Sequence, residues 1–445
     1  MNHLFGTDGI RGAAGAAPLD RPTLIRVGYA LARHLPEPNP RILIGRDTRS
    51  SGADLETWLQ EGVRTGGGQT VSTGVLTTPA VAILTRRFGF SAGVMISASH
   101  NPYPDNGVKV FSSNGNKSSD QLESAIESEV LNSHDDLSVD ETPPTAPDPE
   151  LRKEYASFLK STLSSPPSLA NLRIVLDCAN GAGYEVGPNL LTTLGLTVVS
   201  MGITPDGRNI NQNCGSTHPE HMARRVVETN SDLGAALDGD GDRLILADHE
   251  GNIINGDAIL LMCARRLKRE NRLHGPGVVA TVMSNLALEK ALEVEGIRLC
   301  RTQVGDKYVS EEMSRQGLPL GGEQSGHIIF SDHAPTGDGL LTLLQVLRVM
   351  TLEGKSLAEL ARLEPFPQVL LNIRVKDKPE IVTVPEIALA AEVAEQRLKG
   401  RGRVLIRYSG TEPLLRIMME GPDEAEILEL SDSVGDAARR AIGDS

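Results

Sequence analysis

Short apolar runs alternate with amphipathic stretches along the first part of the chain. Strands are predicted at 41–44, 69–72 and 93–96, and helices are predicted from Ser51 onward and over 79–88. This order of elements is typical of a βαβ series. The pattern therefore predicts a parallel or mixed sheet covered by helices.

The same alternation returns twice further along the chain. Strands of the second series are predicted at 173–177, 196–201 and 233–237, and strands of the third at 278–283 and 297–304. Helices are predicted between them, as parallel neighbours require. The chain therefore contains three similar βα series in a row.

Two changes in composition indicate domain boundaries. The segment 133–149 is rich in Ser, Asp, Thr and Pro and almost lacks large apolar residues, which is typical of a linker. Near residue 365 the βα alternation ends, and strands at 369–375 and 414–420 flank a helix over 387–398. The tail is therefore a domain of a different kind.

Composition excludes several classes of protein. The formal net charge of −14 argues against a nucleic-acid-binding protein, although local arginines can still form an anion pocket. No apolar run approaches the ~20 residues that cross a bilayer, and the first residues lack the features of a signal peptide. The 4 cysteines include no CxxC pair and fit a reducing compartment. We therefore expect a cytoplasmic protein that binds no nucleic acid and no membrane.

A serine and a histidine follow the buried strand at 93–96. The apolar run stops at Ser97, so Ser99 and His100 lie on a loop at a strand end, where open α/β sheets bind ligands. Pro104 and the residues 105–107 are predicted to keep the backbone in turns before the next strand. Alternatively, both side chains only cap backbone groups of an ordinary connection.

Single arginines near strand ends add candidate anion contacts. Arg46 and Arg49 follow the strand at 41–44 and predict either an anion site at the same sheet edge or surface salt bridges. Arg11 lies in a glycine-rich opening, 6–12, that is predicted to form turns. None of these features identifies a function alone.

Three aspartates alternate with glycines directly after the strand at 233–237. Asp238, Asp240 and Asp242 would repel one another unless a cation lay among them, and carboxylate oxygens are ligands of Mg²⁺ or Ca²⁺. An EF-hand is excluded, because Arg243 stands where that loop needs Gly and the twelfth position is not Glu. A solvated acidic turn is the alternative. The free coordination positions are typical of Mg²⁺ sites for phosphate chemistry.

Two further polar turns could bind a sugar phosphate. The glycine-flanked segment 322–327 brings Glu, Gln, Ser and His together, which suits sugar hydroxyls, although a bulge between two strands is the alternative. The segment 407–413 combines an arginine with hydroxyl groups on one predicted loop. Such a set could hold a phosphate through a guanidinium fork, or could be a polar turn.

Taken together, five motifs resemble those of one enzyme family. They are Phe5–Gly12, Ile96–Pro102, Asp238–Arg243, Gly322–His327 and Arg407–Pro413. On these residues the chain is identified as a member of the α-D-phosphohexomutase superfamily, most similar to its glucosamine-phosphate branch. The resemblance spans nearly the whole chain. It implies an α/β fold of three related mixed α/β domains and a smaller C-terminal α+β domain around a central cleft, with ranges 1–148, 149–251, 252–364 and 365–445.

The resemblance also implies a reaction and the residues that carry it. Ser99 would carry a phosphoryl group, and glucosamine 6-phosphate and 1-phosphate would be interconverted through a 1,6-bisphosphate. It implies that Mg²⁺ is bound by Asp238, Asp240, Asp242 and the Ser99 phosphate, and that Arg11, Lys109 and Arg243 hold the remaining negative charge of the phosphoryl group. Proton transfer to and from the sugar hydroxyl would involve His100, His327 or Lys307. The sugar would be bound by Glu323 and Ser325, and the phosphate that is not transferred would be bound by Arg407, Ser409, Gly410 and Thr411.

Several alternatives remain open at this point. A mutase of mannose or glucose phosphates from the same superfamily is the nearest one. A metal-dependent phosphomonoesterase that uses Ser99, and a non-catalytic sugar-phosphate sensor, are others. The resemblance further implies a possible homodimer.

Overall fold

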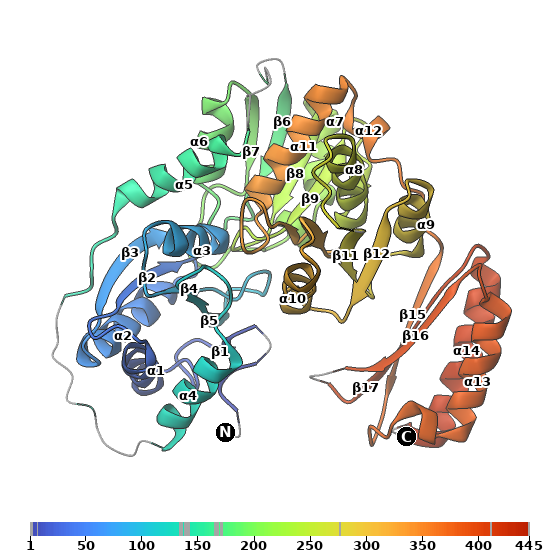
Figure 1. The fold of residues 1–445 in the computed structure, drawn as a ribbon, viewed down its shortest axis with the longest axis horizontal. Helices are drawn as coiled ribbons and strands as arrows, with labels where there is room; N and C mark the ends of the chain where they lie inside the picture. The colour runs from blue at the N-terminus through green and yellow to red at the C-terminus, as the bar shows by residue number, and fades with distance from the viewer. Residues whose placement is uncertain are drawn as a thin grey trace. The chain divides into compact units, whose positions relative to one another are not determined.

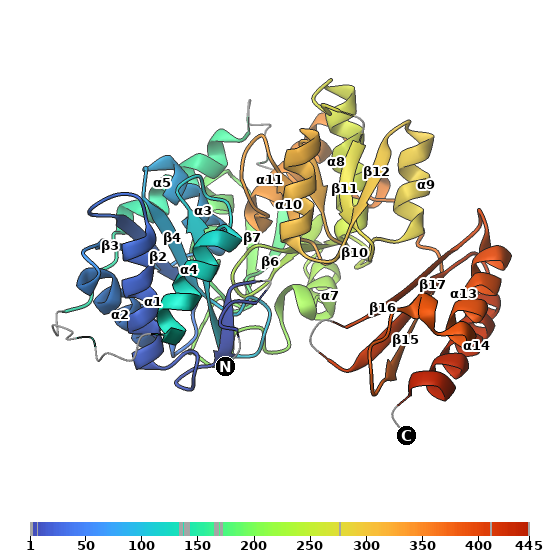
Figure 2. The same cartoon turned by 60° about the horizontal axis from the view of Figure 1, so that its bottom comes forward.

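A computed structural model describes most of the chain. The described residues are 3–6, 8–132, 137, 143–163, 169, 172–275, 277–409 and 412–443. Two compact units make up the fold, one of Met1–Met283 with Ile297–Arg362 and one of Ser284–Gly296 with Leu363–Ser445. The first unit carries three sheets and the second carries one (Figures 1 and 2).

The first sheet is mixed and has the strand order β1-β5-β4-β2-β3. Its strands are β1 (Ile10–Ala13), β2 (Arg41–Arg46), β3 (Gln69–Val75), β4 (Ala92–Ile96) and β5 (Asp105–Ser112). Its helices are α1 (Arg21–His34), α2 (Gly52–Thr65), α3 (Thr78–Arg87) and α4 (Asp120–Asn132). Helices α1, α2 and α4 share an aliphatic core with one face, and α3 packs against glycines on the other (Figure 1).

The second sheet repeats this arrangement with the order β10-β9-β8-β6-β7. Its strands are β6 (Arg173–Asp177), β7 (Thr197–Met201), β8 (Leu233–Leu237), β9 (Leu244–Asp248) and β10 (Ile253–Ile254). Its helices are α5 (Pro149–Ser161), α6 (Val186–Thr193) and α7 (Glu220–Glu228), with a 3₁₀ turn η1 (Gly215–Thr217). Helix α7 packs closely on one face, because a Cβ at Gly234 would lie 2.0 Å from the Met222 sulfur.

The third sheet has the order β12-β11-β13-β14. Its strands are β11 (Gly277–Thr281), β12 (Arg298–Thr302), β13 (Leu320–Gly322) and β14 (Ile328–Phe330). The helices of this part are α8 (Gly256–Arg269), α10 (Asp306–Gln316), α11 (Gly339–Glu353) and the short α12 (Leu357–Leu360). Helix α10 contributes Val309 and Met313 to the core of this sheet.

The three sheets share one topology. In each, a middle strand (β2, β6 or β11) is parallel to both neighbours, and one neighbour (β4, β8 or β13) then pairs antiparallel with the next strand. The prediction of three related mixed α/β domains is confirmed. The strands β4, β8 and β13 are equivalent, and the Ser99 loop, the aspartate loop and the Glu323 turn directly follow them.

The second unit is smaller and has an α+β fold, as predicted. Its antiparallel sheet has the order β15-β17-β16, formed by β15 (Gln368–Arg374), β16 (Arg403–Tyr408) and β17 (Leu414–Glu420). Its helices are α9 (Leu286–Val294), α13 (Pro385–Leu398) and α14 (Glu424–Ile442), with a 3₁₀ turn η2 (Ile381–Thr383). Residues of α13 and α14 share a core with the buried face of β17.

Three local predictions are wrong. Residues 105–107 begin strand β5, and Arg11 lies in strand β1, because Asn106 and Gly107 pair with Gly12 and Arg11 across the sheet. A long-range pairing therefore overrides the local turn preference of these residues. Helix α10 was not expected over Asp306–Gln316; it is polar and buries only two of its residues, so its apolar stripe is narrow.

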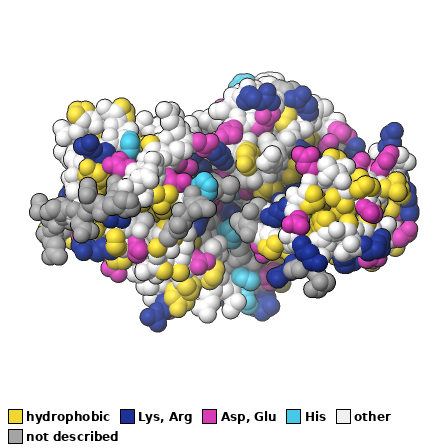
Figure 3. Space-filling model, turned by 90° about the horizontal axis from the view of Figure 1, so that it is seen from below, with side chains coloured by type: hydrophobic (Ala, Val, Ile, Leu, Met, Phe, Trp, Pro, Cys, Tyr) yellow, Lys and Arg dark blue, Asp and Glu magenta, His cyan; other side chains and the backbone are white. Residues whose placement is uncertain are grey.

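The surface carries charges of both signs. On the face drawn in Figure 3, Lys and Arg side chains are interspersed with Asp and Glu side chains. Among the described helices, none has both the length and the apolar character to cross a membrane. The linker predicted at 133–149 lies partly outside the described residues, and α5 begins at its end.

Candidate active site

The serine loop, residues 97–104, connects β4 to β5. Ser99 has the left-handed backbone angle φ 50°, which is rare for residues other than glycine. Its side chain is almost wholly buried, with 3% of the residue exposed. Ser99 Oγ donates a hydrogen bond to Asp238 Oδ2 at 2.6 Å, and His100 Nδ1 lies 3.3 Å from the same hydroxyl. The loop therefore presents its serine directly to the aspartate loop.

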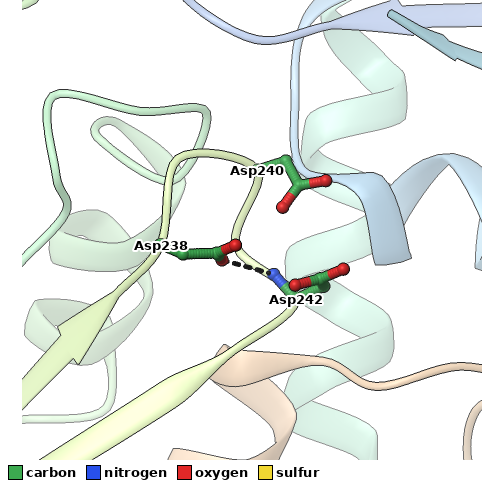
Figure 4. Close-up of side chains that lie close together, drawn as sticks. All are labelled: Asp238, Asp240 and Asp242. Atoms are coloured by element: carbon green, nitrogen blue, oxygen red, sulfur yellow. Dashed lines mark hydrogen bonds between the residues drawn. The ribbon is translucent and has the colours of Figure 1, made fainter. Parts of the chain in front are cut away.

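The aspartate loop, residues 238–243, connects β8 to β9 and turns its three carboxylates toward one another (Figure 4). Asp238 Oδ1 accepts hydrogen bonds from the backbone N–H groups of Asp242 and Arg243, at 3.1 and 3.2 Å. Gly241 has φ 76°, a backbone conformation that favours glycine. Oxygen atoms of the three aspartates lie within 4.8 Å of one another, all on buried residues.

These carboxylates lack enough protein partners for their charge. Asp240 Oδ2 accepts from Thr78 Oγ1 at 2.6 Å and from Lys109 Nζ at 3.0 Å. Within the described residues, the buried Oδ1 atoms of Asp240 and Asp242 have no hydrogen-bond partner. Burial and the neighbouring charges of Asp242 and Asp240 raise the pKa of Asp238 well above its ordinary value. A bound cation would satisfy these oxygens and keep the group ionised.

Three cationic side chains surround the loop. Lys109 Nζ lies 3.0 Å from Asp240, 3.7 Å from Asp242 and 3.5 Å from Asp8. Burial alone would lower the pKa of Lys109, but these carboxylates raise it above its ordinary value. Arg11 donates to the carbonyl oxygen of Ser97 at 2.9 Å and pairs with Asp8, and Arg243 Nε lies 3.9 Å from Asp242 Oδ1. Lys109 and Arg243 therefore place positive charge beside the aspartates.

A cavity of about 290 Å³ opens between the two loops. It is lined by Asp8, Ser99, His100, Lys109, Asp242, Arg243, Val304, Gly305, Asp306, Lys307, Tyr308, Glu323 and His327. Most of the predicted site residues of the first unit therefore surround one space. Its size is at the lower end of the range of small-molecule sites, roughly 300–1,000 Å³.

The Glu323 turn forms one wall of this cavity. Glu323 Oε1 accepts from the N–H of Gly305 at 3.1 Å, and the Ser325 hydroxyl lies 3.4 Å from Glu323 Oε2. Gly326 has φ 93°, and a Cβ there would lie 2.2 Å from the carbonyl oxygen of Leu244. The turn joins the antiparallel strands β13 and β14, and this close approach brings it against the end of the aspartate loop.

The three candidates for proton transfer differ in their surroundings. Partial burial and the charge of Arg243 lower the pKa of His100 to about 4, so the ring is neutral at pH 7. His327 is buried; its Nε2 lies 3.1 Å from the backbone nitrogen of Gly337, and its Nδ1 lies 3.6 Å from Asp242. Lys307 donates to Asp120 at 2.5 Å.

The proposal of an anion site at Arg46 and Arg49 is wrong. Arg46 pairs with Glu56 at 3.1 Å. Arg49 is 1% exposed and donates to Asp47 and to backbone carbonyls of the serine loop. Both guanidinium groups therefore bind partners within the protein instead of an external anion.

Sequence reasoning missed several residues that shape the site. Asp8, Lys117 and Asp306 form a bridge in which Lys117 Nζ lies 2.7 Å from each carboxylate. Asn211 donates to the backbone of Ser99 from the loop before η1. The only available signal was their position in polar loops near strand ends, which many loops share.

The predicted phosphate-binding residues lie in the second unit. Arg407 is in strand β16, opposite Arg416, and not on the loop where it was predicted. Burial and the charge of Arg416 lower its pKa. Ser409 follows the strand; its hydroxyl accepts from the N–H of Glu412 at 3.3 Å. Gly410 and Thr411 lie outside the described residues.

Family sequence models match the chain in four successive segments. They describe the phosphoglucomutase/phosphomannomutase α/β/α domains I, II and III, at residues 2–136, 153–251 and 255–366, and the C-terminal domain of the same family, at 370–437. The matches follow the order of the three related sheets and the distinct tail.

Curated relatives and solved structures match this chain over nearly its whole length. The chain is 46% identical over 459 residues to the phosphoglucosamine mutase of Geobacter sp. (strain M21), covering 100% of this chain and 99% of that protein. A phosphoglucomutase/phosphomannomutase family protein from Burkholderia thailandensis has a similar fold, with a TM-score of 0.81, 23% identity, and coverage of 98% and 97% of the two chains. The Aspergillus fumigatus N-acetylphosphoglucosamine mutase, solved with GlcNAc-6P and magnesium, has a TM-score of 0.64, 19% identity, and coverage of 98% and 96%.

Proposed function

The chain belongs to the phosphoglucomutase/phosphomannomutase family and is an isomerase, and on that premise we propose that it interconverts glucosamine 6-phosphate and glucosamine 1-phosphate, on the route to UDP-N-acetylglucosamine. The full-length similarity to phosphoglucosamine mutases supports the amino sugar. One observation carries the proposal: Ser99 Oγ lies 2.6 Å from Oδ2 of Asp238, which belongs to a trio of buried aspartates. A nucleophile next to a cation site is the arrangement that phosphoryl transfer needs.

The reaction consists of two phosphoryl transfers. In the first, the bond between phosphorus and Ser99 Oγ breaks, a bond to O1 or O6 of the sugar forms, and the sugar hydroxyl gives up its proton. The resulting 1,6-bisphosphate turns over in the cleft. In the second transfer, its other phosphoryl group returns to Ser99 and the sugar oxygen is protonated. The sugar is isomerised, and no phosphate is consumed.

Mg²⁺ is the cation that we propose for the trio. Asp238, Asp240, Asp242 and a phosphate oxygen on Ser99 would be its ligands. The unpartnered carboxylate oxygens of Asp240 and Asp242 support this fit, since hard oxygen ligands suit Mg²⁺. When bound, the cation would neutralise charge on the transferring group.

The cationic side chains have complementary roles in this mechanism. Lys109, Arg11 and Arg243 would hold the remaining negative charge of the phosphoryl group, which positioning and electrostatics mainly activate. His100 is the best-placed group to exchange the proton, because its neutral ring lies 3.3 Å from Ser99 Oγ. His327 would orient Asp242, and Lys307 would stabilise the cavity wall through Asp120.

The remaining candidates would bind the substrate. Glu323 would accept hydrogen bonds from sugar hydroxyls, and the Ser325 hydroxyl would donate a hydrogen bond to one of them. Arg407 and Ser409, with Gly410 and Thr411, would hold the phosphate that is not being transferred. Because the bisphosphate reverses its orientation between the two transfers, these residues must bind the phosphate at either end of the sugar.

The proposed domain ranges are 1–148, 149–251, 252–364 and 365–445.

The decisive experiment combines intact mass, peptide mapping and an isomerase assay on the purified protein. We expect one phosphoryl group on Ser99 and the highest kcat/KM on glucosamine 6-phosphate. A higher kcat/KM on mannose or glucose 6-phosphate would favour a phosphomannomutase or phosphoglucomutase instead. A protein that carries no phosphate on Ser99 and isomerises none of these sugars would contradict the proposal.

A further inference from the structure

The backbone of Ser99 is held from two sides by side chains that no step of the mechanism uses. Its N–H donates to Ser97 Oγ at 2.9 Å, and Ser97 Oγ donates to Asp47 Oδ2 at 2.6 Å. Arg49 Nε donates to the same carboxylate oxygen at 2.9 Å, and Arg49 Nη2 donates to the carbonyl oxygen of Ser99 at 3.0 Å. The hydrogen bonds therefore form a closed ring that contains both polar backbone groups of Ser99.

A second donor reaches the same carbonyl group from the second sheet's domain. Asn211 Nδ2 lies 2.9 Å from the carbonyl oxygen of Ser99 and 3.1 Å from that of Asn101. Arg49 Nη2 also contacts the carbonyl oxygen of Asn101, at 2.8 Å. Both lone pairs of the Ser99 carbonyl are thus used, and both donors bind the same two peptide groups.

The aspartate loop packs against this same peptide group. A Cβ at Gly239 would lie 2.6 Å from the carbonyl oxygen of Ser99 and 2.7 Å from Asn211 Nδ2. Only glycine leaves room for such a close approach of two backbones. A rotation of the Ser99 peptide would therefore move its hydroxyl away from Asp238 and push its carbonyl oxygen against Gly239.

We propose that Arg49 and Asn211 are positioning residues that lock the Ser99 peptide, so that its hydroxyl, or the phosphoryl group it carries, faces the aspartate loop in both transfers. This inference rests on the proposed function. Ser99 both donates and accepts a phosphoryl group within one catalytic cycle, so its hydroxyl oxygen must occupy the same position in both transfers. A left-handed backbone is strained in a serine, unlike in glycine or asparagine, and it persists where the surroundings enforce it. The two donors to its carbonyl group supply that constraint.

Asn211 offers the sharper test, because Arg49 forms a fully buried ion pair whose loss endangers folding. Asn211→Ser removes both hydrogen bonds to the serine loop. We expect kcat with glucosamine 6-phosphate to fall about 10- to 100-fold, since small displacements of reacting atoms cost this much. KM should change less than about twofold, because the substrate contacts are intact.

Asn213 is the matched control. It lies on the same loop, it is exposed, and it has a left-handed φ of 52° compared with 58° at Asn211. Asn213→Ser should leave kcat unchanged. Asn211→Asp keeps the shape but turns an oxygen toward two carbonyl oxygens, so we expect a larger loss of kcat than with Asn211→Ser. Arg49→Lys keeps the positive charge but loses the planar guanidinium group that donates several hydrogen bonds at once, so its kcat should also be lower than that of the wild type if the variant folds.

A single-turnover measurement separates positioning from general support of the fold. The phosphorylated protein is mixed with glucosamine 6-phosphate, and loss of phosphate from Ser99 is followed by mass spectrometry. Asn211→Ser should transfer to the sugar more slowly, with a thermal midpoint close to that of the wild type. A lower midpoint with an unchanged transfer rate would overturn the positioning role. If the wild type carries no phosphate and does not turn over, the proposed function fails too; if the wild type transfers and the variant transfers equally fast, only this inference fails.

Discussion

The serine loop and the aspartate loop are the same connection in two copies of one sheet. Each follows the last parallel strand, β4 or β8, and leads into its antiparallel neighbour, β5 or β9. The two loops differ in which of their groups have hydrogen-bond partners within the protein. In the serine loop the backbone is held by buried donors and one side chain is presented. In the aspartate loop, glycines make room for the turn, and carboxylate oxygens are left without protein partners.

The comparison shows that topology determines where the loops lie, whereas their side chains determine what the loops can bind. The shared topology brings both loops to the carboxyl ends of parallel strands, where ligand sites form in α/β sheets. The residues then decide the chemistry, because a clamped hydroxyl suits a nucleophile and unpaired carboxylates suit a cation. The third copy, the Glu323 turn after β13, presents hydrogen-bonding groups instead. We therefore expect substitutions in the three loops to differ in their main effect, which is on kcat for the serine loop, on Mg²⁺ binding and kcat for the aspartate loop, and on KM for the Glu323 turn.

Removal of the serine hydroxyl should have the largest effect. Ser99→Ala deletes the atom that accepts and donates the phosphoryl group, so kcat should fall more than about 10³-fold. Binding of glucosamine 6-phosphate, measured by calorimetry, should remain detectable. Ser91→Ala is the control, because Ser91 lies at the opposite end of β4, where its hydroxyl accepts from Arg41 N–H at 3.2 Å. Near-normal turnover of Ser99→Ala would show that Ser99 is not the nucleophile.

Loss of one carboxylate from the aspartate loop should come next. Asp240→Asn removes a charge from the trio, so we expect kcat to fall about 10²-fold and Mg²⁺ to bind about 100-fold more weakly in calorimetry. Chelation of divalent cations should abolish activity of the wild type, and added Mg²⁺ should restore it.

Asp232→Asn is the control for this prediction. Asp232 lies at the opposite end of β8, where its Oδ2 accepts from the N–H of Arg173 at 2.7 Å. Its variant should bind Mg²⁺ as the wild type does. The assignment of the trio as the cation site is wrong if Asp240→Asn also keeps wild-type Mg²⁺ affinity.

Substitution in the third loop should have the smallest effect. Glu323→Gln weakens hydrogen bonds to the sugar, so KM should rise about 10-fold, or about 1.4 kcal/mol, while kcat changes less. Steady-state kinetics measures this split, and the exposed Glu311→Gln on α10 is the control. An effect confined to kcat would place Glu323 in the chemistry of the phosphoryl group and not in sugar binding.

Local patterns predicted many elements but not the long-range pairings. Strand 173–177 is confirmed to the residue, because its apolar run and the polar residues on both sides define it. Arg11 and Gly107 were expected in turns, yet they pair with each other across β1 and β5. Arg49 was expected to bind an anion or to form a surface salt bridge, but it is buried, and beside Asp47 it binds carbonyl groups 50 and more residues away. No local pattern reveals such partners.

By itself, the sequence determined the three repeated βα series, the distinct tail, and the residue types that can hold a cation and carry a phosphoryl group. These follow from hydrophobic periodicity and from the chemistry of each motif, which are local properties of the chain. Only the tertiary structure decided that Ser99 lies 2.6 Å from Asp238, and that Arg49 and Asn211 meet at its carbonyl group. Contacts between residues 50 to 139 positions apart depend on how strands and sheets pack, and that packing arises from the sum of many weak apolar contacts.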